Sequence, residues 1–188
     1  MVCHKVSGAK IFIISGAENS GKDEILQGVE ALARNKASVI AKHSSRNQKL
    51  DDGNELICKH IIKDINVPEK EIEYISNPDY NLDKCDIVYR RKGNSYGLIT
   101  QEIWDGLQQG FFQIIALSDS EAINRLVQIF GDLVVLIYAY SNRNAADKEM
   151  AFDTYLNNIN MYDHVLIYED KKEDLYDQIF RLMNFYEV

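Results

Sequence analysis

The sequence has little positive charge. Its 21 Lys and Arg residues are outnumbered by 29 Asp and Glu residues, which gives a formal net charge of −8 over 188 residues. An acidic chain lacks the broad basic face that binds a nucleic-acid backbone or an anionic membrane surface. We therefore expect no direct contact with nucleic acid, and any phosphate must be bound by a small local site.

Long apolar runs and cysteine pairs are also missing. The longest strongly apolar run, LVVLIYA at residues 133–139, is far shorter than the roughly 20 residues that a membrane-spanning helix needs. The first ten residues have no apolar core of the kind that a secretory signal contains. Cys3, Cys58 and Cys85 are widely spaced, so they predict neither a disulfide framework nor a zinc site. We expect a cytoplasmic protein with no membrane segment.

The chain contains only two prolines, Pro68 and Pro78, and no repeat, linker or low-complexity tract. Its length is typical of one compact domain with one hydrophobic core. We therefore expect a single domain that spans residues 1–188.

Short apolar runs alternate with amphipathic stretches along most of the chain. Residues 10–15 predict a buried strand, and the apolar positions within residues 23–34 fall on one face of a helix. The second half repeats this alternation, with strands expected at 111–117, 133–140 and 165–168 and helices at 120–130 and 173–185. Apolar strands separated by helices indicate an α/β fold with a parallel sheet covered on both faces.

The middle of the chain has a different pattern. Segments 71–75 and 86–91 are short and mixed in polarity, which predicts a small antiparallel insertion at the edge of the sheet. Residues 100–109 carry apolar side chains on one helical face, so a helix is expected to return the chain to the core. Ser120 is expected to cap the helix that follows the next strand.

The first predicted strand and helix are joined by a GxxxxGK motif made of Gly16, Ala17, Glu18, Asn19, Ser20, Gly21 and Lys22. The glycines let successive backbone N–H groups point at phosphate oxygens, the helix adds its dipole, and the lysine supplies a point charge. A position between a buried strand and an amphipathic helix is the context that this motif requires. We predict a phosphate loop that binds ATP, with Lys22 as its catalytic cation.

Asp23 follows this motif, at the position where Ser or Thr normally offers a hydroxyl to magnesium. A carboxylate is a hard oxygen ligand that can hold Mg²⁺ directly or through water. Alternatively, Asp23 only neutralises the helix dipole in a phosphate site that has decayed. We predict Asp23 as the metal ligand, and the magnesium dependence of nucleotide binding separates the two interpretations.

Three downstream motifs resemble the guanylate kinase family. Residues 93–97 read GNSYG, where the family has GNYYG before a helix. Residues 44–55 read SSRNQKLDDGNE, which is similar to TTRxxR followed by DGxDY, and residues 162–167 read YDHVLI, which is similar to YDYVIVN. The resemblance implies a three-layer P-loop kinase fold, with an acceptor-binding insertion at about residues 43–98 and a reduced lid at about residues 141–160.

The same resemblance implies which residues bind the acceptor. Arg46, Lys49 and Tyr96 would hold its phosphate. Ser118 would also bind the acceptor, because the similar ribose bisphosphate phosphokinases have a Ser near this position. Guanidinium, ammonium and phenol groups are suitable donors to a phosphate dianion. Alternatively, Arg46 and Lys49 are a solvated surface pair.

Two departures from the family pattern bear on activity. Guanylate kinases read the guanine edge with two acids and a small hydroxyl residue, whereas the aligned positions here are Ile87, Ser118 and Leu98. The family lid carries arginines that neutralise the transferring phosphoryl group, whereas Arg143 is the only arginine between residue 141 and Arg181. Base reading and turnover are therefore both in question.

The leading prediction is an ATP-dependent and Mg²⁺-dependent phosphotransferase that acts on a nucleoside monophosphate, with GMP indicated by the resemblance. One alternative is a phosphosugar kinase, because the similar ribose bisphosphate phosphokinases also carry Asp after the loop lysine. The other is a nucleotide-binding module of the same fold that has lost turnover. The expected partners are a nucleotide and a phosphorylated small-molecule acceptor, while a protein partner or a homodimer stays open.

Overall fold

The computed structural model describes residues 8–17, 19–44, 82–91, 94–141 and 159–187. Its strands and helices, in chain order, are β1 (Ile11–Ser15), α1 (Lys22–Leu32), β2 (Ala37–Val39), β3 (His43–Ser44), β4 (Ile87–Arg91), β5 (Asn94–Leu98), α3 (Thr100–Gln108), β6 (Phe112–Ala116), α4 (Ser120–Phe130), β7 (Val134–Ser141), β8 (His164–Tyr168) and α6 (Lys172–Tyr186). Within these segments, none of the helices has both the length and the apolar character that crossing a bilayer requires.

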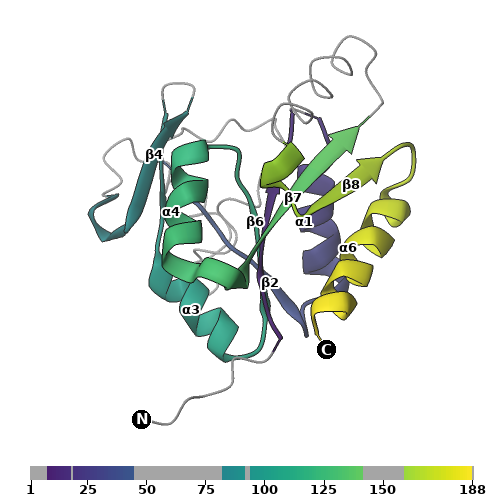
Figure 1. Ribbon diagram of the computed structural model, residues 1–188, viewed down its shortest axis with the longest axis horizontal. Helices are drawn as coiled ribbons and strands as arrows, with labels where there is room; N and C mark the ends of the chain where they lie inside the picture. The colour runs from purple at the N-terminus through teal and green to yellow at the C-terminus, as the bar shows by residue number, and fades with distance from the viewer. Residues whose placement is uncertain (1–7, 18, 45–81, 92–93, 142–158, 188) are drawn as a thin grey trace, which may run out of the picture.

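Five strands form a parallel sheet in the order β2-β6-β1-β7-β8 (Figure 1). The central strand β1 pairs with β6 on one side and with β7 on the other. All five residues of β1 are buried, as expected for a strand that is covered on both faces. The predicted parallel sheet is therefore confirmed.

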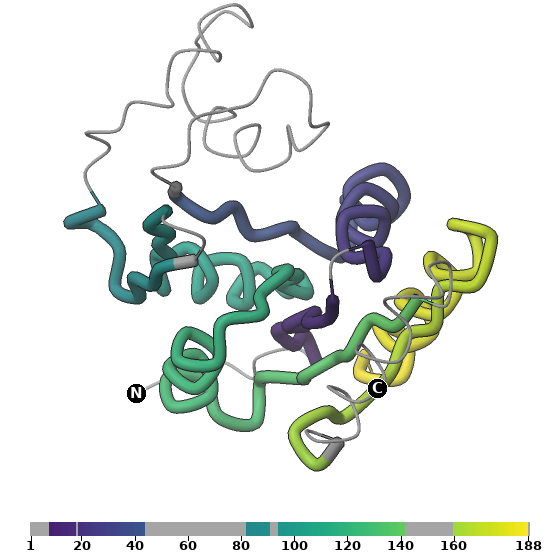
Figure 2. Tube along the Cα trace, turned by 90° about the horizontal axis from the view of Figure 1, so that it is seen from above, coloured from purple at the N-terminus to yellow at the C-terminus, as the bar shows by residue number. Residues whose placement is uncertain are grey.

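Helices cover both faces of this sheet. Figure 2 shows α1 and α6 on one side of the strands and α3 and α4 on the other. The side chains of β1 alternate accordingly, because Phe12 and Ile14 pack in the cluster under α1 and α6, whereas Ile11 and Ile13 pack in the cluster under α3 and α4. The result is the three-layer α/β architecture that the sequence predicted.

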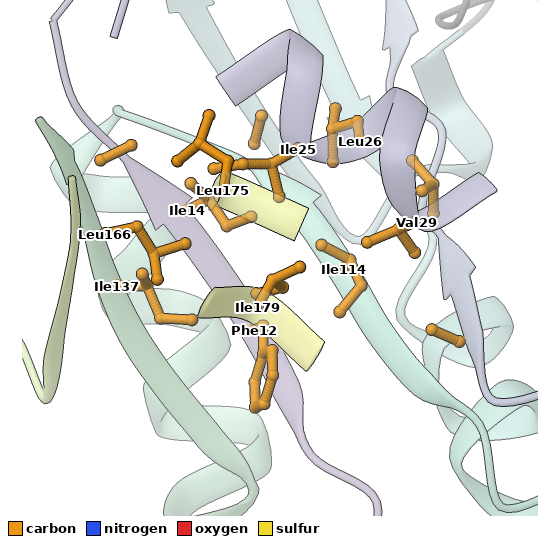
Figure 3. Packing of buried hydrophobic residues seen from close by; sticks show 14 of the residues in the cluster. Phe12, Ile14, Ile25, Leu26, Val29, Ile114, Ile137, Leu166, Leu175 and Ile179 are labelled. Carbon is orange, nitrogen blue, oxygen red and sulfur yellow. The ribbon is translucent and has the colours of Figure 1, made fainter. Parts of the chain in front are cut away.

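Close packing joins α1 and α6 above the first of these clusters (Figure 3). Ile25 from α1 and Leu175 from α6 are completely buried together with Ile14 of the central strand. Gly28 allows the helices to approach, because a Cβ at this position would lie 2.2 Å from the ring of Tyr176 on α6. The helix that carries the end of the phosphate loop is thus fixed against the C-terminal helix.

A second, antiparallel sheet has the strand order β3-β5-β4. Its β4 strand lies beside α4 in Figure 1, and Ile87, Tyr89 and Leu98 join the cluster under α3 and α4. The strand predicted at 86–91 is confirmed as β4, whereas the one predicted at 71–75 lies outside the described residues. The small antiparallel sheet therefore shares a hydrophobic core with the parallel sheet.

The helix caps differ in part from the sequence-based expectation. Ser120 is the first residue of α4, and the cap is the preceding Asp119, whose carboxylate accepts a hydrogen bond of 2.9 Å from the backbone N–H of Ala122. The expectation that Ser120 caps this helix is therefore wrong. An aspartate serves better here because its negative charge also interacts favourably with the positive end of the helix dipole.

Candidate active site

The turn between β1 and α1 has an unusual backbone. The φ angles are +148° at Gly16, +59° at Asn19 and +92° at Gly21. Glycine adopts positive φ values at low cost, and asparagine tolerates the left-handed region better than most residues. Such a backbone curls between strand and helix, and consecutive N–H groups in a curled segment can face a single anion. Glu18, a further residue of this loop, lies outside the described residues.

Both glycines of the motif are in close contact with neighbouring elements. A Cβ at Gly16 would lie 2.3 Å from the carbonyl oxygen of Ala139 on β7 and 2.7 Å from Ser20 Oγ. A Cβ at Gly21 would lie 2.7 Å from the ring of Tyr168 and 2.8 Å from Leu175. The loop therefore packs directly against β7, β8 and α6, and a larger residue at either glycine would displace the loop.

Lys22 begins α1, and its side chain reaches back across the loop. Its Nζ donates hydrogen bonds to the carbonyl oxygen of Gly16 at 2.8 Å, to the carbonyl oxygen of Ala17, and to Ser20 Oγ at 3.1 Å. The ammonium thus lies at the N-terminus of α1, where the helix dipole is positive. The ammonium and the helix dipole together create a positive potential at this end of α1, and a positive potential suits a phosphate group.

The loop lies where the connections of the parallel sheet diverge. After β1 the chain crosses through α1 to β2, and after β6 it passes over β1 through α4 to β7. The ends of β1 and β6 remain side by side, and Leu117 N donates to Ile14 O at 3.0 Å. Ligands of open α/β sheets bind outside the carboxyl ends of the strands at such a position. The GxxxxGK loop therefore lies at the edge where sheets of this kind bind ligands.

Two further side chains lie at this edge. Ser118 follows β6, and its hydroxyl donates to the carbonyl oxygen of Gly16 at 3.5 Å, so it contacts the start of the phosphate loop. Lys42 follows β2, and its Nζ donates to the carbonyl oxygen of Ala116 at 2.7 Å. Ser118 was among the candidates found in the sequence, whereas Lys42 was not.

Tyr96 lies in β5 of the small sheet, where its ring stacks on Tyr89 with a centroid distance of 5.4 Å and an interplanar angle of 17°. The backbone of Ser44 in β3 pairs directly with Tyr96. The chain that leads from Ser44 to Arg46 and Lys49 therefore starts beside Tyr96. Arg46 and Lys49 themselves lie outside the described residues, so their predicted role is not tested by this structure.

Two of the three positions aligned with the family's base-reading residues are part of the hydrophobic core. Ile87 is 1% exposed and Leu98 is 0% exposed, and they face each other across β4 and β5. The neighbouring Asp86 does not replace them, because its carboxylate accepts hydrogen bonds of 2.8 Å from both the backbone N–H and the hydroxyl of Thr100 at the start of α3. These two hydrogen bonds hold the pKa of Asp86 below its usual range, and the bond from the backbone N–H of Thr100 has the larger effect.

Asp23, the predicted magnesium ligand, is an exposed residue in the first turn of α1. It directly follows Lys22, and an exposed carboxylate beside a phosphate loop has the oxygen chemistry that Mg²⁺ prefers. In the described part of the chain, no three His, Cys, Asp or Glu residues group together as a ready-made metal site. A single exposed carboxylate suits Mg²⁺ that takes its other ligands from water or from a bound phosphate group.

The comparisons with known proteins agree with this arrangement at the level of the fold. The crystal structure of a guanylate kinase from Anaplasma phagocytophilum superimposes with a TM-score of 0.65 and 13% sequence identity, over 97% of this chain and 88% of that one. This chain has a guanylate kinase-like fold. No protein-family model and no curated protein sequence matches it.

The sequence reasoning missed two contacts, that of Lys42 with Ala116 at the site and that of Asp86 with Thr100 at the start of α3. A lysine immediately before the HSSR segment was visible in the sequence as a cation near the predicted acceptor motif. Nothing in the sequence, however, indicated that its ammonium would reach β6. For Asp86, the capped residue Thr100 lies fourteen positions away in the chain, so no local capping pattern could reveal the contact.

Proposed function

We propose that the protein is an ATP-dependent phosphotransferase of the guanylate kinase type, which transfers the γ-phosphate to a nucleoside monophosphate. GMP is the first acceptor to test. The observation that carries this proposal is the phosphate loop, in which Lys22 bridges Gly16, Ala17 and Ser20 at the carboxyl edge of β1. A loop of this kind binds phosphates, and we assign the acceptor to the small second sheet β3-β5-β4.

Each residue has a defined task in the proposed reaction. Lys22 and the N-terminus of α1 neutralise the phosphates of ATP, which lowers the barrier to phosphoryl transfer. Asp23 holds Mg²⁺, which supplies further charge neutralisation when it is bound. Arg46, Lys49 and Tyr96 orient the acceptor through its phosphate, and Tyr96 is suited to this task because stacking on Tyr89 fixes its ring.

A phosphosugar is the second candidate acceptor, and one observation favours it. Ile87 and Leu98 are buried in the core at two of the three positions where guanylate kinases are expected to read guanine. Buried aliphatic side chains offer a base edge no hydrogen bonds, whereas a phosphosugar requires none there. The third candidate is a nucleotide-binding module of the same fold without turnover. It is supported by the sequence of the predicted lid, which has Arg143 as its only arginine and lies mostly outside the described residues.

The experiment is an assay of ADP formation from ATP and magnesium with a panel of nucleoside monophosphates and phosphosugars. Wild type is compared with Lys22→Ala, which removes the loop cation, and with Lys36→Ala as a matched control. Lys36 is an exposed lysine that pairs with Glu187 at 2.8 Å, away from the loop. ADP formation that depends on an acceptor, survives in Lys36→Ala and is lost in Lys22→Ala supports the kinase and identifies its acceptor class.

The opposite result is equally informative. No turnover with any acceptor, together with ATP binding that Lys22→Ala weakens, contradicts the kinase and supports the nucleotide-binding module. The absence of any ATP binding by wild type contradicts both.

The role of Asp23 has its own test. We expect Asp23→Asn to reduce the magnesium dependence of ATP-analogue affinity, measured by calorimetric titration at several magnesium concentrations. Glu24→Gln is the matched control, because Glu24 lies in the same helical turn. If wild type binds the nucleotide equally well with and without magnesium, Asp23 is not a metal ligand.

A further inference from the structure

Lys42 lies where the chain leaves the parallel sheet. The backbone ladder between β2 and β6 continues to Ile40, whose N–H donates to Ile114 O at 2.8 Å. The carbonyl of Ala116 comes next along the same side of β6, and it accepts a hydrogen bond from Lys42 Nζ at 2.7 Å. The lysine side chain thus brings a positive charge to the carboxyl end of β6.

This position lies between the two halves of the proposed site. On one side, Ala116 precedes Ser118 by two residues, and Ser118 contacts the phosphate loop at Gly16. On the other side, Lys42 directly precedes β3, where Ser44 pairs with Tyr96. An anion bound between the phosphate loop and Tyr96 would therefore lie near the ammonium of Lys42.

The charges at the carboxyl ends of the parallel strands bear on the role of Lys42. The protein has a net charge of −8, so a phosphorylated acceptor needs local cations to approach. In the described segments that follow β1, β2 and β6, the lysines are Lys22 and Lys42. The neighbouring His43 adds no charge at neutral pH, because burial lowers its pKa. Lys22 serves the phosphate loop, so of these two described lysines Lys42 is the one on the acceptor side.

We propose that Lys42 binds the phosphate of the acceptor between the phosphate loop and Tyr96, with the Ala116 carbonyl fixing the position of its ammonium. This inference rests on the proposed phosphotransferase function and adds a residue to it. The hydrogen bond to Ala116 by itself is also compatible with a purely structural role, in which Lys42 only fastens the end of β2 to β6. The two roles make different demands on the side chain, since the structural one needs a donor and the binding one needs a charge.

Three variants at position 42 separate these demands. Lys42→Arg keeps both the charge and a donor, Lys42→Gln keeps a donor without the charge, and Lys42→Met keeps neither. Steady-state kinetics are measured with the panel member that wild type phosphorylates best, and calorimetric titration with Mg²⁺ and a non-hydrolysable ATP analogue reports donor binding. Lys36→Met is the control, because it also removes a lysine near β2 but at the opposite end of that strand.

Loss of a charge-assisted hydrogen bond to the acceptor predicts that Lys42→Gln and Lys42→Met both raise the KM of the acceptor by about tenfold to a hundredfold. Donor affinity should change by less than about twofold, and kcat should fall much less than kcat/KM, since the lost contact is made in the ground state as well. Lys42→Arg should recover most of the acceptor affinity. Higher ionic strength should weaken acceptor binding in wild type more than in Lys42→Gln.

The outcomes distinguish this inference from the proposed function. If wild type phosphorylates an acceptor and Lys42→Gln leaves its KM unchanged, the inference fails while the proposed function stands. If wild type phosphorylates no member of the panel, the proposed function fails, and titration of GMP and ribose 5-phosphate into wild type and Lys42→Gln then decides the phosphate site. Equal affinities of the two proteins in that titration, or no binding to either, overturn the inference as well.

Discussion

Substitution of Gly16 by alanine tests whether the conformation of the phosphate loop depends on its close contact with β7. The new Cβ would lie 2.3 Å from the backbone oxygen of Ala139, and this atom belongs to a strand within the sheet. The φ angle of +148° at Gly16 adds backbone strain for any residue with a side chain. Neither conflict can be relieved by rotating a flexible side chain, so we expect the loop itself to move.

Gly131 provides a matched reference. Its φ is +52°, and an added Cβ would meet no atom within 4 Å, so Gly131→Ala introduces backbone strain without a steric clash. Strain of this kind costs about 1–3 kcal/mol. Gly16→Ala adds an overpacking cost of similar size, about 1–3 kcal/mol, which gives a total of roughly 2–6 kcal/mol. This is a large part of the roughly 5–15 kcal/mol by which folded domains are stable.

Urea unfolding of both variants measures these costs, and calorimetric titration with a magnesium-bound ATP analogue measures loop function. We expect Gly16→Ala to unfold at lower urea than Gly131→Ala and to lose at least about tenfold in nucleotide affinity, equivalent to roughly 1.4 kcal/mol. Gly131 lies at the end of α4, before β7 begins, so its substitution should leave affinity within about twofold. Equal stability of the two variants, or full nucleotide affinity in Gly16→Ala, would refute the reasoning.

Two further predictions concern contacts at the ends and edges of elements. Asp86→Ala should lower the free energy of unfolding by about 1 kcal/mol at neutral pH, because α3 loses the carboxylate that Thr100 contacts twice. The pKa of Asp86 is lowered in the folded state, so this stabilisation is present above the ordinary carboxyl pKa of about 3.9 and is lost as the pH falls through the lowered folded value. Gln178→Ala should promote concentration-dependent self-association in sedimentation velocity, because the Gln178 amide accepts from Ile167 N at 2.9 Å and donates to Ile167 O at 2.8 Å on the edge strand β8.

Each of these predictions has a control. Asp86→Asn keeps an oxygen acceptor without the charge, so it should retain part of the stability and lose the pH dependence. A difference between wild type and Asp86→Ala that does not decrease as the pH falls would contradict the assigned contact. For the edge strand, Gln27→Ala removes an exposed glutamine from α1. Self-association that is equal in both glutamine variants would show that the Gln178 amide does not protect β8.

The elements around the phosphate loop could be predicted because their signals are local. The apolar run at 10–15, the glycines at 16 and 21, and the helical face of 23–34 lie next to one another in the chain. The structure places β1 at Ile11–Ser15 and α1 at Lys22–Leu32. Backbone conformation in such a segment depends mainly on neighbouring residues, since glycine and helical periodicity act over a few positions.

The short strands could not be predicted in the same way. β2 has three residues and β3 has two, which is too few positions for a period-two pattern to be recognised. They are strands because β6 and β5 offer backbone partners to them, and those partners lie about fifty to eighty positions further along the chain. The same holds for Asp86 as a helix cap and for the contact of Lys42 with Ala116.

By itself, the sequence determined that the chain forms a covered parallel sheet with a glycine-rich turn after its first strand, because apolar periodicity and glycine act locally on backbone conformation. The tertiary structure decided which other groups face that loop. It placed Lys42 and Ser118 at the carboxyl edge of β6, buried Ile87 and Leu98 in the core, and engaged Asp86 with Thr100. These outcomes follow from strand order and pairing register, which depend on contacts between residues far apart in the chain.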